Sequence, residues 1–372
     1  METTMQKKLR VGVIFGGRSG EHDVSLMSSH SVLKVLDPEK YEVFQVGITR
    51  QGAWVTGEDV WSALKSGQTE HLTPAVLIPQ PGQAVLYALK QQTLEAVTEL
   101  DVIFPVLHGT FGEDGTLQGL LEMADVAYVG AGVLGSAVGM DKALFKDVMR
   151  ANNLPVVDSI LVLRRDIEEN IQDVITRVEA MGYPLFTKPA NLGSSVGITR
   201  CRGRADLHEG LLEAARFDRR VIVERGVNHA REIEVAVLGN DTPVASVPGE
   251  IRPGDEFYSY EAKYLMETSE LLIPAPLPEE TTSHVQELAV RAYQAIDCAG
   301  LARVDFLMDG QTGEIWISEI NTIPGFTQIS MYPKLWEASG LPYGTLVDRL
   351  IALALERKAE RDRTERVFRR GS

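Results

Sequence analysis

The first fifty residues of this 372-residue chain strongly restrict its fold. The apolar run Val11–Phe15 predicts a buried strand, and a glycine-rich turn at residues 16–20 follows it at once. The next residues predict a helix with Val24, Met27 and Val32 on its inner side, and residues 41–48 predict a second strand. A strand, a helix and a strand in this order form a βαβ unit, which requires a parallel sheet covered by helices. We therefore predict an α/β fold that opens with a Rossmann-like parallel sheet.

The remaining segments predict a different arrangement toward the C-terminus. Residues 102–106 predict another buried strand, whereas residues 51–95 show no clear order. A helix begins at Asp141 as N-cap, and alternation at residues 232–237 predicts a half-buried strand. Further strands are expected at 183–188, 221–224, 302–308 and 314–320, and a helix at 281–297. The last part is therefore α+β. The predicted divisions are three domains, 1–130, 131–226 and 227–358, and a charged tail, 359–372.

Composition excludes several classes of function. The net charge of −15 argues against general attraction to nucleic acid or to an anionic membrane. No apolar stretch approaches the length of a membrane span, and Val11–Phe15 is too short for the core of a signal peptide. Cys201 and Cys298 lie far apart without metal-like spacing, which favours a reduced intracellular protein.

The two last predicted strands flank the turn-forming residues 309–313, Asp-Gly-Gln-Thr-Gly, and so predict a hairpin. In a register symmetric about the middle of this turn, Asp305 lies opposite Glu319. In the same register Arg303 lies opposite Asn321. Because side chains along a strand alternate with a period of two, all four are expected on one face of the hairpin.

This polar face is a candidate metal site. Two carboxylates that lie opposite each other repel unless a cation lies between them. Oxygen ligands from Asp305, Glu319 and Asn321 suit Mg²⁺, which keeps water and phosphate oxygens in its other positions. The alternative is an exposed polar face of an edge hairpin. The Pro-Gly turn at residues 324–325 favours the site, because it brings backbone N–H groups near the same face.

Two glycine-rich segments are candidates for nucleotide binding. Residues 191–197, Asn-Leu-Gly-Ser-Ser-Val-Gly, follow the strand that ends near Lys188, and small residues let backbone N–H groups approach phosphate oxygens. The segment lacks the ending of a Walker loop, so a plain surface loop is the alternative. Residues 130–135 match the G-x-G-x-x-G pattern of dinucleotide-binding folds. Asn-Asn-Leu-Pro at 152–155 replaces the required acidic residue, so a nicotinamide-dependent oxidoreductase is the weaker alternative.

Two further loops follow buried strands and carry acidic groups. In open α/β sheets such loops lie at the carboxyl ends of the strands, where ligands bind. Glu21, in the first loop, could bind an ammonium group or could merely favour the N-terminus of the following helix. His108, at the start of the second loop, could line a site or could be a hydrogen-bonded core histidine.

Seven motifs occur along the chain in a fixed order. They are Phe-Gly-Gly-Arg-Ser-Gly-Glu-His-Asp-Val-Ser (15–25), His-Gly-Thr-Phe-Gly-Glu-Asp-Gly-Thr-Leu-Gln-Gly (108–119), Met-Asp-Lys (140–142), Lys-Pro-Ala-Asn-Leu-Gly-Ser-Ser-Val-Gly (188–197), Tyr-Ser-Tyr-Glu-Ala-Lys-Tyr (258–264), Arg-Val-Asp-Phe (303–306) and Glu-Ile-Asn-Thr-Ile-Pro-Gly-Phe-Thr (319–327). Together they resemble the D-alanine–D-alanine ligase family of the ATP-grasp superfamily, from Gly12 to about Leu355. The resemblance implies a three-domain ATP-grasp fold with ATP between the second and third domains.

The resemblance also implies the nucleotide and metal positions. ATP is the co-substrate, and two Mg²⁺ ions, or Mn²⁺ in their place, are the cofactor. The residues that match ATP-binding positions are Lys142, Lys188, Ser194, Ser195, Glu224, Val227 and Glu232. The residues that match magnesium ligands are Asp305, Glu319 and Asn321, the same set that the hairpin register predicts.

For the substrates, Glu21 matches the carboxylate that holds the ammonium of the first D-alanine, and loop 249–269 closes over the site. Arg303 and the backbone N–H of Gly325 resemble an oxyanion-stabilising pair. The implied catalytic set is Glu21, Ser194, Tyr264, Arg303 and Gly325. The implied substrate-binding set is Glu21, His108, Lys263, Ser330 and Met331, with Lys263 and Ser330 on the carboxylate of the second D-alanine.

The implied reaction joins two D-alanines through a D-alanyl phosphate, releases ADP and phosphate, and supplies peptidoglycan precursors. The implied setting is a homodimer in the bacterial cytoplasm, without a nucleic-acid or membrane partner. A D-alanine–D-lactate or D-alanine–D-serine ligase is the alternative within the family. Tyr264 is associated with dipeptide formation, whereas Met331 stands where these ligases often have leucine. A nucleotide-binding protein without catalytic activity is the alternative from another class.

Overall fold

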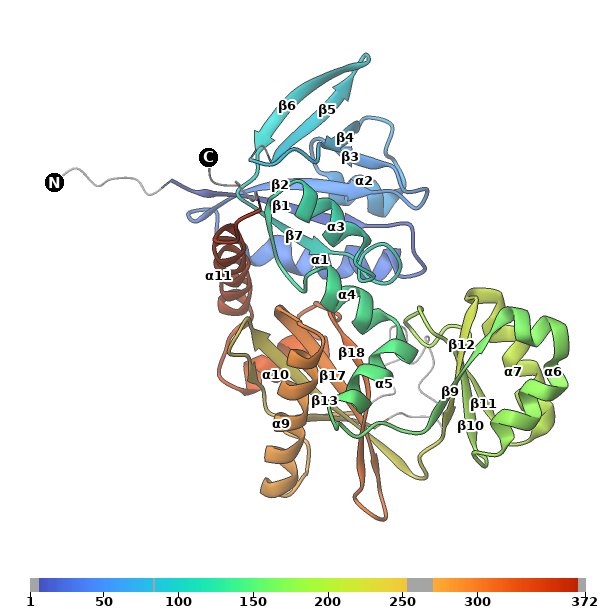
Figure 1. The fold of residues 1–372 in the computed structure, drawn as a ribbon. Coiled ribbons are helices and arrows are strands. Elements are labelled where there is room, and N and C mark those ends of the chain that lie inside the picture. Colours follow the sequence, from blue (N-terminus) through green and yellow to red (C-terminus); the bar gives the residue numbers. More distant parts are fainter. Residues whose placement is uncertain (1–6, 83, 253–269, 367–372) are drawn as a thin grey trace, which may run out of the picture.

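The first of the three sheets in the described part of the chain is a parallel sheet with an antiparallel extension (Figure 1). The computed structural model describes residues 7–82, 84–252 and 270–366. Within these ranges the sheet has the order β6-β5-β4-β3-β2-β1-β7-β8, and β2, β1, β7 and β8 run parallel. The strands are β1 (Leu9–Gly16), β2 (Tyr41–Ile48), β3 (Trp54–Thr56), β4 (Thr73–Leu77), β5 (Val85–Lys90), β6 (Thr93–Glu99), β7 (Val102–Val106) and β8 (Ala127–Tyr128). The predicted Rossmann-like sheet is confirmed, and the unordered stretch 51–95 is its antiparallel part, with helix α2 (Val60–Ser66).

Helix α1 (His22–Val35) packs against this sheet with a partly polar inner face. Val24 and Val32 are buried as predicted, but Met27 is 45% exposed, so its predicted inward position is wrong. The buried face instead includes three serines, Ser25, Ser28 and Ser29. The Ser25 hydroxyl accepts from the last N–H of β1 at 2.7 Å and donates to the last carbonyl of β7. A buried hydroxyl costs little when it is hydrogen-bonded, so these small polar residues let the helix lie close to the strand ends.

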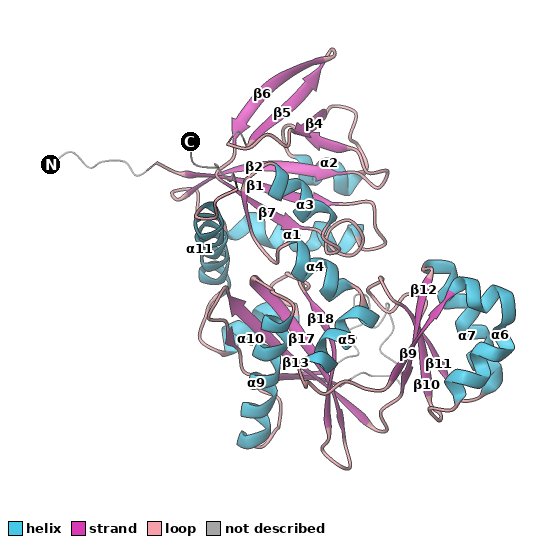
Figure 2. Cartoon of the chain, in the orientation of Figure 1, coloured by secondary structure: helices cyan, strands magenta, loops and turns pink. Residues whose placement is uncertain are grey.

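The second sheet is antiparallel and is covered on one face by α6 (Arg164–Glu179) and α7 (Arg204–Phe217), as Figure 2 shows. Its order is β11-β10-β12-β9. The strands are β9 (Ser159–Leu163), β10 (Leu185–Pro189), β11 (Thr199–Cys201) and β12 (Arg220–Arg225). The helices between β7 and this sheet in the sequence are α3 (Thr116–Met123), α4 (Val133–Met140) and α5 (Lys142–Ala151). Asp141 caps α5 as predicted, since its carboxylate accepts from the Leu144 N–H at 2.9 Å.

The third sheet is antiparallel, which confirms the α+β character of the last part. Its order is β16-β15-β13-β17-β18, with β14 beside β13. The strands are β13 (Ala230–Gly239), β14 (Val244–Ala245), β15 (Gly249–Arg252), β16 (Glu270–Leu272), β17 (Gly300–Asp309) and β18 (Ile315–Asn321), and the helices are α9 (Glu279–Ala295), α10 (Met331–Ala338) and α11 (Tyr343–Asp362). Val235 of β13 packs in a core with α9, whereas Ala236 packs in a core with α10 and α11. The sheet is therefore buried on both sides of its central strand.

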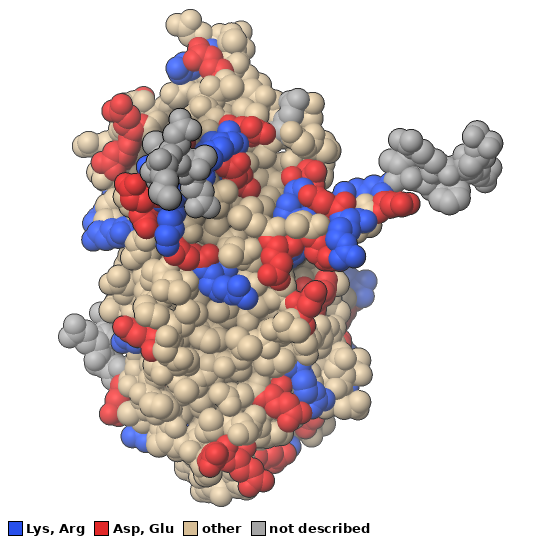
Figure 3. Space-filling model, turned by 90° about the vertical axis from the view of Figure 1, so that its left-hand side faces the viewer, with Lys and Arg blue, Asp and Glu red and all other residues tan. Residues whose placement is uncertain are grey.

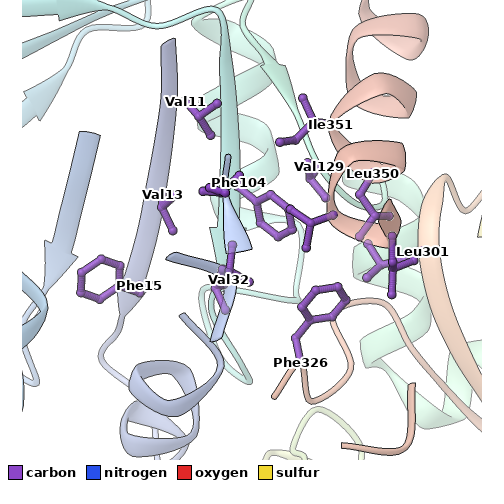
Figure 4. Close-up of a cluster of buried hydrophobic side chains, with 14 of the residues drawn as sticks. Val11, Val13, Phe15, Val32, Phe104, Val129, Leu301, Phe326, Leu350 and Ile351 are labelled. Carbon is purple, nitrogen blue, oxygen red and sulfur yellow. The ribbon is translucent and has the colours of Figure 1, made fainter. Parts of the chain in front are cut away.

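The largest apolar core joins the first and third sheets (Figure 4). Phe104 of β7 lies 6.1 Å from Phe326 between ring centroids, and Phe326 follows the β17–β18 hairpin. Helix α11, at the end of the third predicted domain, adds Leu350 and Ile351 to the same core. This packing holds the carboxyl ends of β1 and β7 near the hairpin. The predicted domain limits at residues 130, 226 and 358 stay a prediction.

The G-x-G-x-x-G segment at residues 130–135 has a packing role in this fold. A Cβ atom at Gly300 would lie 3.1 Å from the Gly130 nitrogen, and a Cβ at Gly135 would lie 3.1 Å from the Asp297 carbonyl oxygen. Gly130 also has φ +101°, which favours glycine. These glycines let the start of α4 approach the loop before β17 closely, which accounts for the pattern without a dinucleotide.

The molecular surface carries charges of both signs. On the face that Figure 3 turns toward the viewer, Lys and Arg lie among Asp and Glu around a broad uncharged area. The net charge of the whole sequence is −15. In the part of the chain that the structure describes, no helix combines the length and apolarity that a membrane crossing requires.

We predict that Leu350→Ala lowers the free energy of unfolding by about 2–5 kcal/mol, because it leaves a cavity in the core shared by two sheets. Leu350 is 0% exposed, whereas Leu212 on α7 is 47% exposed and serves as the matched control. Leu212→Ala should change stability by about 0.5 kcal/mol or less. Urea unfolding followed by fluorescence measures both. Equal shifts for the two variants would contradict the shared core.

Candidate active site

A cavity lies where the strand ends of the first sheet, the loop after β10 and the β17–β18 hairpin converge. It brings together many residues that the sequence places far apart. The predicted site residues that line it are Glu21, His108, Lys142, Ser194, Arg303, Glu319, Asn321, Gly325, Ser330 and Met331. Asp305 lies directly behind it, bound to Arg303. Lys263 and Tyr264 lie outside the described residues, as does most of loop 249–269.

The third sheet carries a row of three carboxylates on the face toward this cavity. Glu234 of β13 pairs with Asp305 of β17, and Asp305 pairs with Glu319 of β18. The predicted pairs Asp305–Glu319 and Arg303–Asn321 are therefore confirmed. The symmetric register itself is not kept toward the turn, because a bulge at Ser318 shifts Phe306 to pair with Ile317. The bulge gives β18 its extra residue and keeps Glu319 on the same face as Asp305.

Cations from two different elements offset the charge of this row. Arg303 holds Asp305 through two hydrogen bonds of 2.6 Å and lies 2.9 Å from a Glu234 carboxylate oxygen. Burial opposes the charged guanidinium, but both carboxylates outweigh it, and the pKa of Arg303 is raised well above its usual value. Lys142 of α5 lies 3.4 Å from the Glu319 carboxylate. Glu319 therefore faces the cavity with a lysine beside it.

The oxygen donors at the end of the hairpin fit a hard divalent cation. Among the described residues, no three His, Cys, Asp or Glu side chains are grouped to hold a metal ion. The predicted set contains two carboxylates, Asp305 and Glu319, and the Asn321 amide, whose nitrogen donates to Asp305 at 2.9 Å. The amide oxygen is left as a third acceptor. Such a set suits Mg²⁺ when phosphate oxygens and water supply its other ligands.

Glu21 lies in a small polar enclosure at the start of α1. It occupies the N-cap position, but its side chain makes no capping bond and instead accepts a hydrogen bond from the Ser194 hydroxyl. Two glycines leave room for this carboxylate. A Cβ at Gly109 would lie 2.4 Å from one of its oxygens, and a Cβ at Gly193 would lie 3.2 Å away. Glu21 is thus positioned to bind a cationic group, which favours the first of its two predicted roles.

His108 is a buried histidine that joins α1 to the segment after β18. Its Nδ1 lies 2.9 Å from the Ile323 carbonyl oxygen and its Nε2 lies 3.1 Å from the Ser28 hydroxyl. The Ser28 oxygen also accepts from the Phe326 N–H at 3.3 Å. Burial lowers the pKa of His108, although Glu21 opposes this, so the neutral ring donates from Nδ1. The network holds both ends of the Pro-Gly turn that carries Gly325.

Glu113, which is not among the predicted site residues, also lines the cavity. Its carboxylate accepts from the Gly109 N–H at 2.7 Å and from the Ile323 N–H at 3.1 Å. Burial first, and then the nearby Glu21 charge, raise the pKa of Glu113 to about 8. The side chain thus links the His108 loop to the turn after β18 and is mostly protonated near neutral pH.

The predicted nucleotide residues lie beside the cavity, between α5 and the second sheet. Lys142 donates to the Leu192 carbonyl of the glycine-rich loop at 2.8 Å. In that loop Ser194 and Ser195 have φ of +53° and +58°, a backbone conformation that residues with a side chain rarely adopt. Lys188 donates to the buried Glu224 at 2.7 Å. Val227 lies between β12 and β13, Glu232 lies within β13, and neither is among the residues that line this cavity. Their ATP-binding roles stay a prediction.

Two predicted second-substrate residues, Ser330 and Met331, also line the cavity. The Ser330 hydroxyl accepts from the Thr327 N–H at 3.1 Å, and a Cβ at Gly325 would lie 3.2 Å from the Ser330 oxygen. Met331 is 6% exposed and its sulfur would contact a side chain at Gly249. The roles of Lys263 and Tyr264 stay predictions, because these residues lie outside the described ranges.

Sequence reasoning missed three residues at or beside the cavity, namely Glu113, Glu234 and Lys146. Glu234 stands in an ordinary alternating strand, and only its register with Asp305 places it at the site. Lys146 of α5 is fully buried, although lysine is rarely found in a core. A pattern could have indicated it, because Lys142 and Lys146 occupy inward positions of a helix together with Phe145 and Met149.

Family models match most of the chain. The model described as D-ala D-ala ligase N-terminus matches residues 10–131, and the model described as D-ala D-ala ligase C-terminus matches residues 148–352. The chain is 52% identical over 365 residues to the D-alanine--D-alanine ligase of Heliobacterium modesticaldum. The match covers 97% of this chain and 99% of that protein.

Solved structures of two relatives are also similar. The D-alanine-D-alanine ligase from Coxiella burnetii has a TM-score of 0.81 and 37% identity, and the match covers 96% of this chain and 97% of that one. The VanG D-Ala:D-Ser ligase from Enterococcus faecalis has a TM-score of 0.82 and 34% identity, and the match covers 94% and 100%.

We predict that Glu113→Gln changes the pH dependence of stability. Between the ordinary pKa of 4.5 and the folded value of about 8, the folded state binds more protons than the unfolded state. The free energy of unfolding therefore falls as pH rises through this range, and glutamine removes this fall. Relative to the native protein, the variant should gain on the order of 4 kcal/mol between about pH 5 and about pH 9.

Chemical unfolding at several pH values measures this difference. The glutamine NH₂ faces one of the two backbone N–H donors, so the variant also loses a hydrogen bond. This loss lowers the free energy of unfolding by the same amount at every pH and does not change how that free energy varies with pH. Parallel pH profiles for the two proteins would contradict the raised pKa.

Proposed function

The chain belongs to the D-alanine–D-alanine ligase family, which has the ATP-grasp fold, and on that premise we propose how its own residues join two D-alanines with ATP. The predicted family and fold class are therefore confirmed. The observation that carries the proposal is that Glu234 and Glu319, which flank Asp305 in one row, line the same cavity as Glu21 and Ser194. This arrangement supports a phosphate site beside an ammonium site, which an ATP-dependent amino-acid ligase requires.

In the first step the carboxylate of one D-alanine attacks the γ-phosphate of ATP and forms D-alanyl phosphate. Phosphoryl transfer depends mainly on positioning and on charge neutralisation. Glu21, oriented by Ser194, holds the ammonium of this D-alanine. Lys142 and Lys188 hold phosphate oxygens. Asp305, Glu319 and Asn321 would hold Mg²⁺, or Mn²⁺ in its place, and the metal supplies positive charge at the transferred phosphate.

In the second step the amine of another D-alanine attacks the acyl phosphate and releases phosphate. The tetrahedral intermediate carries a negative oxygen, and the Arg303 guanidinium and the Gly325 N–H are the donors that stabilise it. One such donor typically contributes about 3 kcal/mol to the transition state. The Ser28–His108 network holds the turn that presents Gly325. Ser330, next to Met331, contacts the carboxylate of the second D-alanine together with Lys263. Tyr264 of loop 249–269 joins Ser194 as a hydrogen-bonding partner of Glu21 and closes the loop over the site.

The wider setting of the enzyme follows from its substrates. D-Alanyl-D-alanine is a building block of peptidoglycan, so we propose that the enzyme acts in the bacterial cytoplasm, where ATP and D-alanine are available. Cys201 and Cys298 are both buried and unpaired within the described chain, in agreement with a reducing compartment. We further propose a homodimer and the domain limits 1–130, 131–226 and 227–358.

Product analysis tests the reaction. Purified protein is incubated with ATP, Mg²⁺ and D-alanine, and parallel samples also contain D-lactate or D-serine. We expect D-alanyl-D-alanine as the dominant product, with one phosphate released per dipeptide. A mixed product formed in preference would favour the D-serine or D-lactate alternative, to which the similarity with the VanG ligase draws attention. ATP binding without D-alanine-dependent turnover would contradict the proposal.

We predict that Glu319→Gln raises the Mg²⁺ concentration for half-maximal activity by about 10- to 100-fold, because it removes one of two carboxylates from the metal position. Glu314 lies on the same hairpin, is exposed and is not among the residues that line the cavity, so Glu314→Gln is the matched control. Magnesium titrations of the initial rate measure both variants. The same magnesium requirement in both would show that Glu319 is not a metal ligand.

A further inference from the structure

Helix α5 has an inner face that is half apolar and half cationic. Lys142, Phe145, Lys146 and Met149 are buried and recur at the spacing of one helical stripe. Figure 1 shows α5 between the β17–β18 hairpin and the second sheet. Lys142 lies at the cavity, but Lys146 lies one turn deeper and its side chain is 0% exposed. A buried ammonium group is costly unless it is paired and hydrogen-bonded, so its partners indicate why it is there.

Lys146 contacts two elements that carry the proposed ATP and metal residues. Its Nζ lies 3.3 Å from one oxygen of Glu224, on β12 of the second sheet. The same Nζ donates to the carbonyl oxygen of Ser318 at 3.1 Å. Ser318 is the bulge residue of β18 and directly precedes Glu319. One ammonium group therefore joins the strand of Glu224 to the strand of Glu319.

Glu224 is shared between two lysines. Its second oxygen accepts from Lys188 at 2.7 Å, while its first faces Lys146. Burial favours the neutral acid, but both lysines outweigh it, and the pKa of Glu224 is lowered to about 2. The carboxylate is therefore charged at neutral pH. If Lys188 also contacts a phosphate, its single charge is divided between the phosphate and Glu224. A second cation then compensates the buried carboxylate.

We propose that Lys146 is a positioning residue, which compensates Glu224 so that Lys188 can bind phosphate, and which holds the Ser318 bulge so that Glu319 faces the metal position. This inference rests on the proposed function, because it assigns Lys188 and Glu319 their roles there. Lys146 itself touches no substrate. A lysine that merely fills the core would support stability alone, and its loss would leave nucleotide binding unchanged in the folded protein.

The test replaces Lys146 with methionine, which is similar in length and uncharged. Lys188 is then the only lysine within contact of Glu224 among the described residues, and it is held there more strongly. We expect Lys146→Met to weaken ADP binding, measured by calorimetry with Mg²⁺, by about 10- to 100-fold. The KM for ATP should rise to a similar extent, whereas the KM for D-alanine should stay within about twofold.

Two other variants serve as controls. Lys146→Arg keeps the cation and should retain most of the ADP affinity. Lys90→Met makes the same replacement at an exposed position of the β5–β6 hairpin, where the side chain is 54% exposed, and should bind ADP as the native protein does. Thermal unfolding of each variant shows the temperature range in which binding can be compared.

A folded Lys146→Met protein with native ADP affinity would overturn the proposal. If that variant does not fold, Lys146→Gln replaces it, because glutamine can still donate to the Ser318 carbonyl but carries no charge. The proposal expects weakened ADP binding for this variant too, and native affinity would contradict it. A native protein that binds ADP and makes no dipeptide would contradict the proposed function alone, because the comparison of ADP affinities needs no turnover.

Discussion

The register between β13, β17 and β18 is the constraint on which the site depends. It aligns Glu234, Asp305 and Glu319 in one row, and three carboxylates at strand spacing repel one another unless cations lie among them. Arg303 meets this need from the same sheet, and Lys142 meets it from α5. The ion pair between Lys142 and Glu319 therefore attaches the helix to the sheet, in addition to apolar packing.

The apolar core performs a second task, which is to bring the first sheet to this row. Phe104 and Phe326 contact each other between the sheets, and α11 packs over both (Figure 4). Glu21 and His108 stand at the ends of β1 and β7, so the core places them across the cavity from Glu319. The hydrogen bonds of Ser28 and Glu113 then connect the loops directly to the turn after β18.

Much of this arrangement follows from local pattern. The strands at 41–48 and 102–106, the cap at Asp141 and the facing pair Asp305–Glu319 depend on periodicity, capping and turn length, which neighbouring residues determine. The missed features depend on distant partners. The inner face of α1 is partly polar, because Ser25 hydrogen-bonds to the ends of β1 and β7 and Ser28 hydrogen-bonds to His108. A prediction from hydrophobicity alone therefore placed Met27 wrongly. The bulge at Ser318 depends on how β18 pairs with β17, and Lys146 of a distant helix donates to the Ser318 carbonyl.

The sequence by itself determined the parallel opening sheet, the acidic hairpin and, through seven motifs, the family. These properties are local or are carried by short motifs, so residues close together in the sequence determine them. Only the tertiary structure decided that Glu234 joins the row, that Glu113 bridges two loops and that Glu224 is shared by Lys146 and Lys188. The physical reason is that charge compensation inside a protein depends on distances between elements, and packing sets those distances after the local structure has formed.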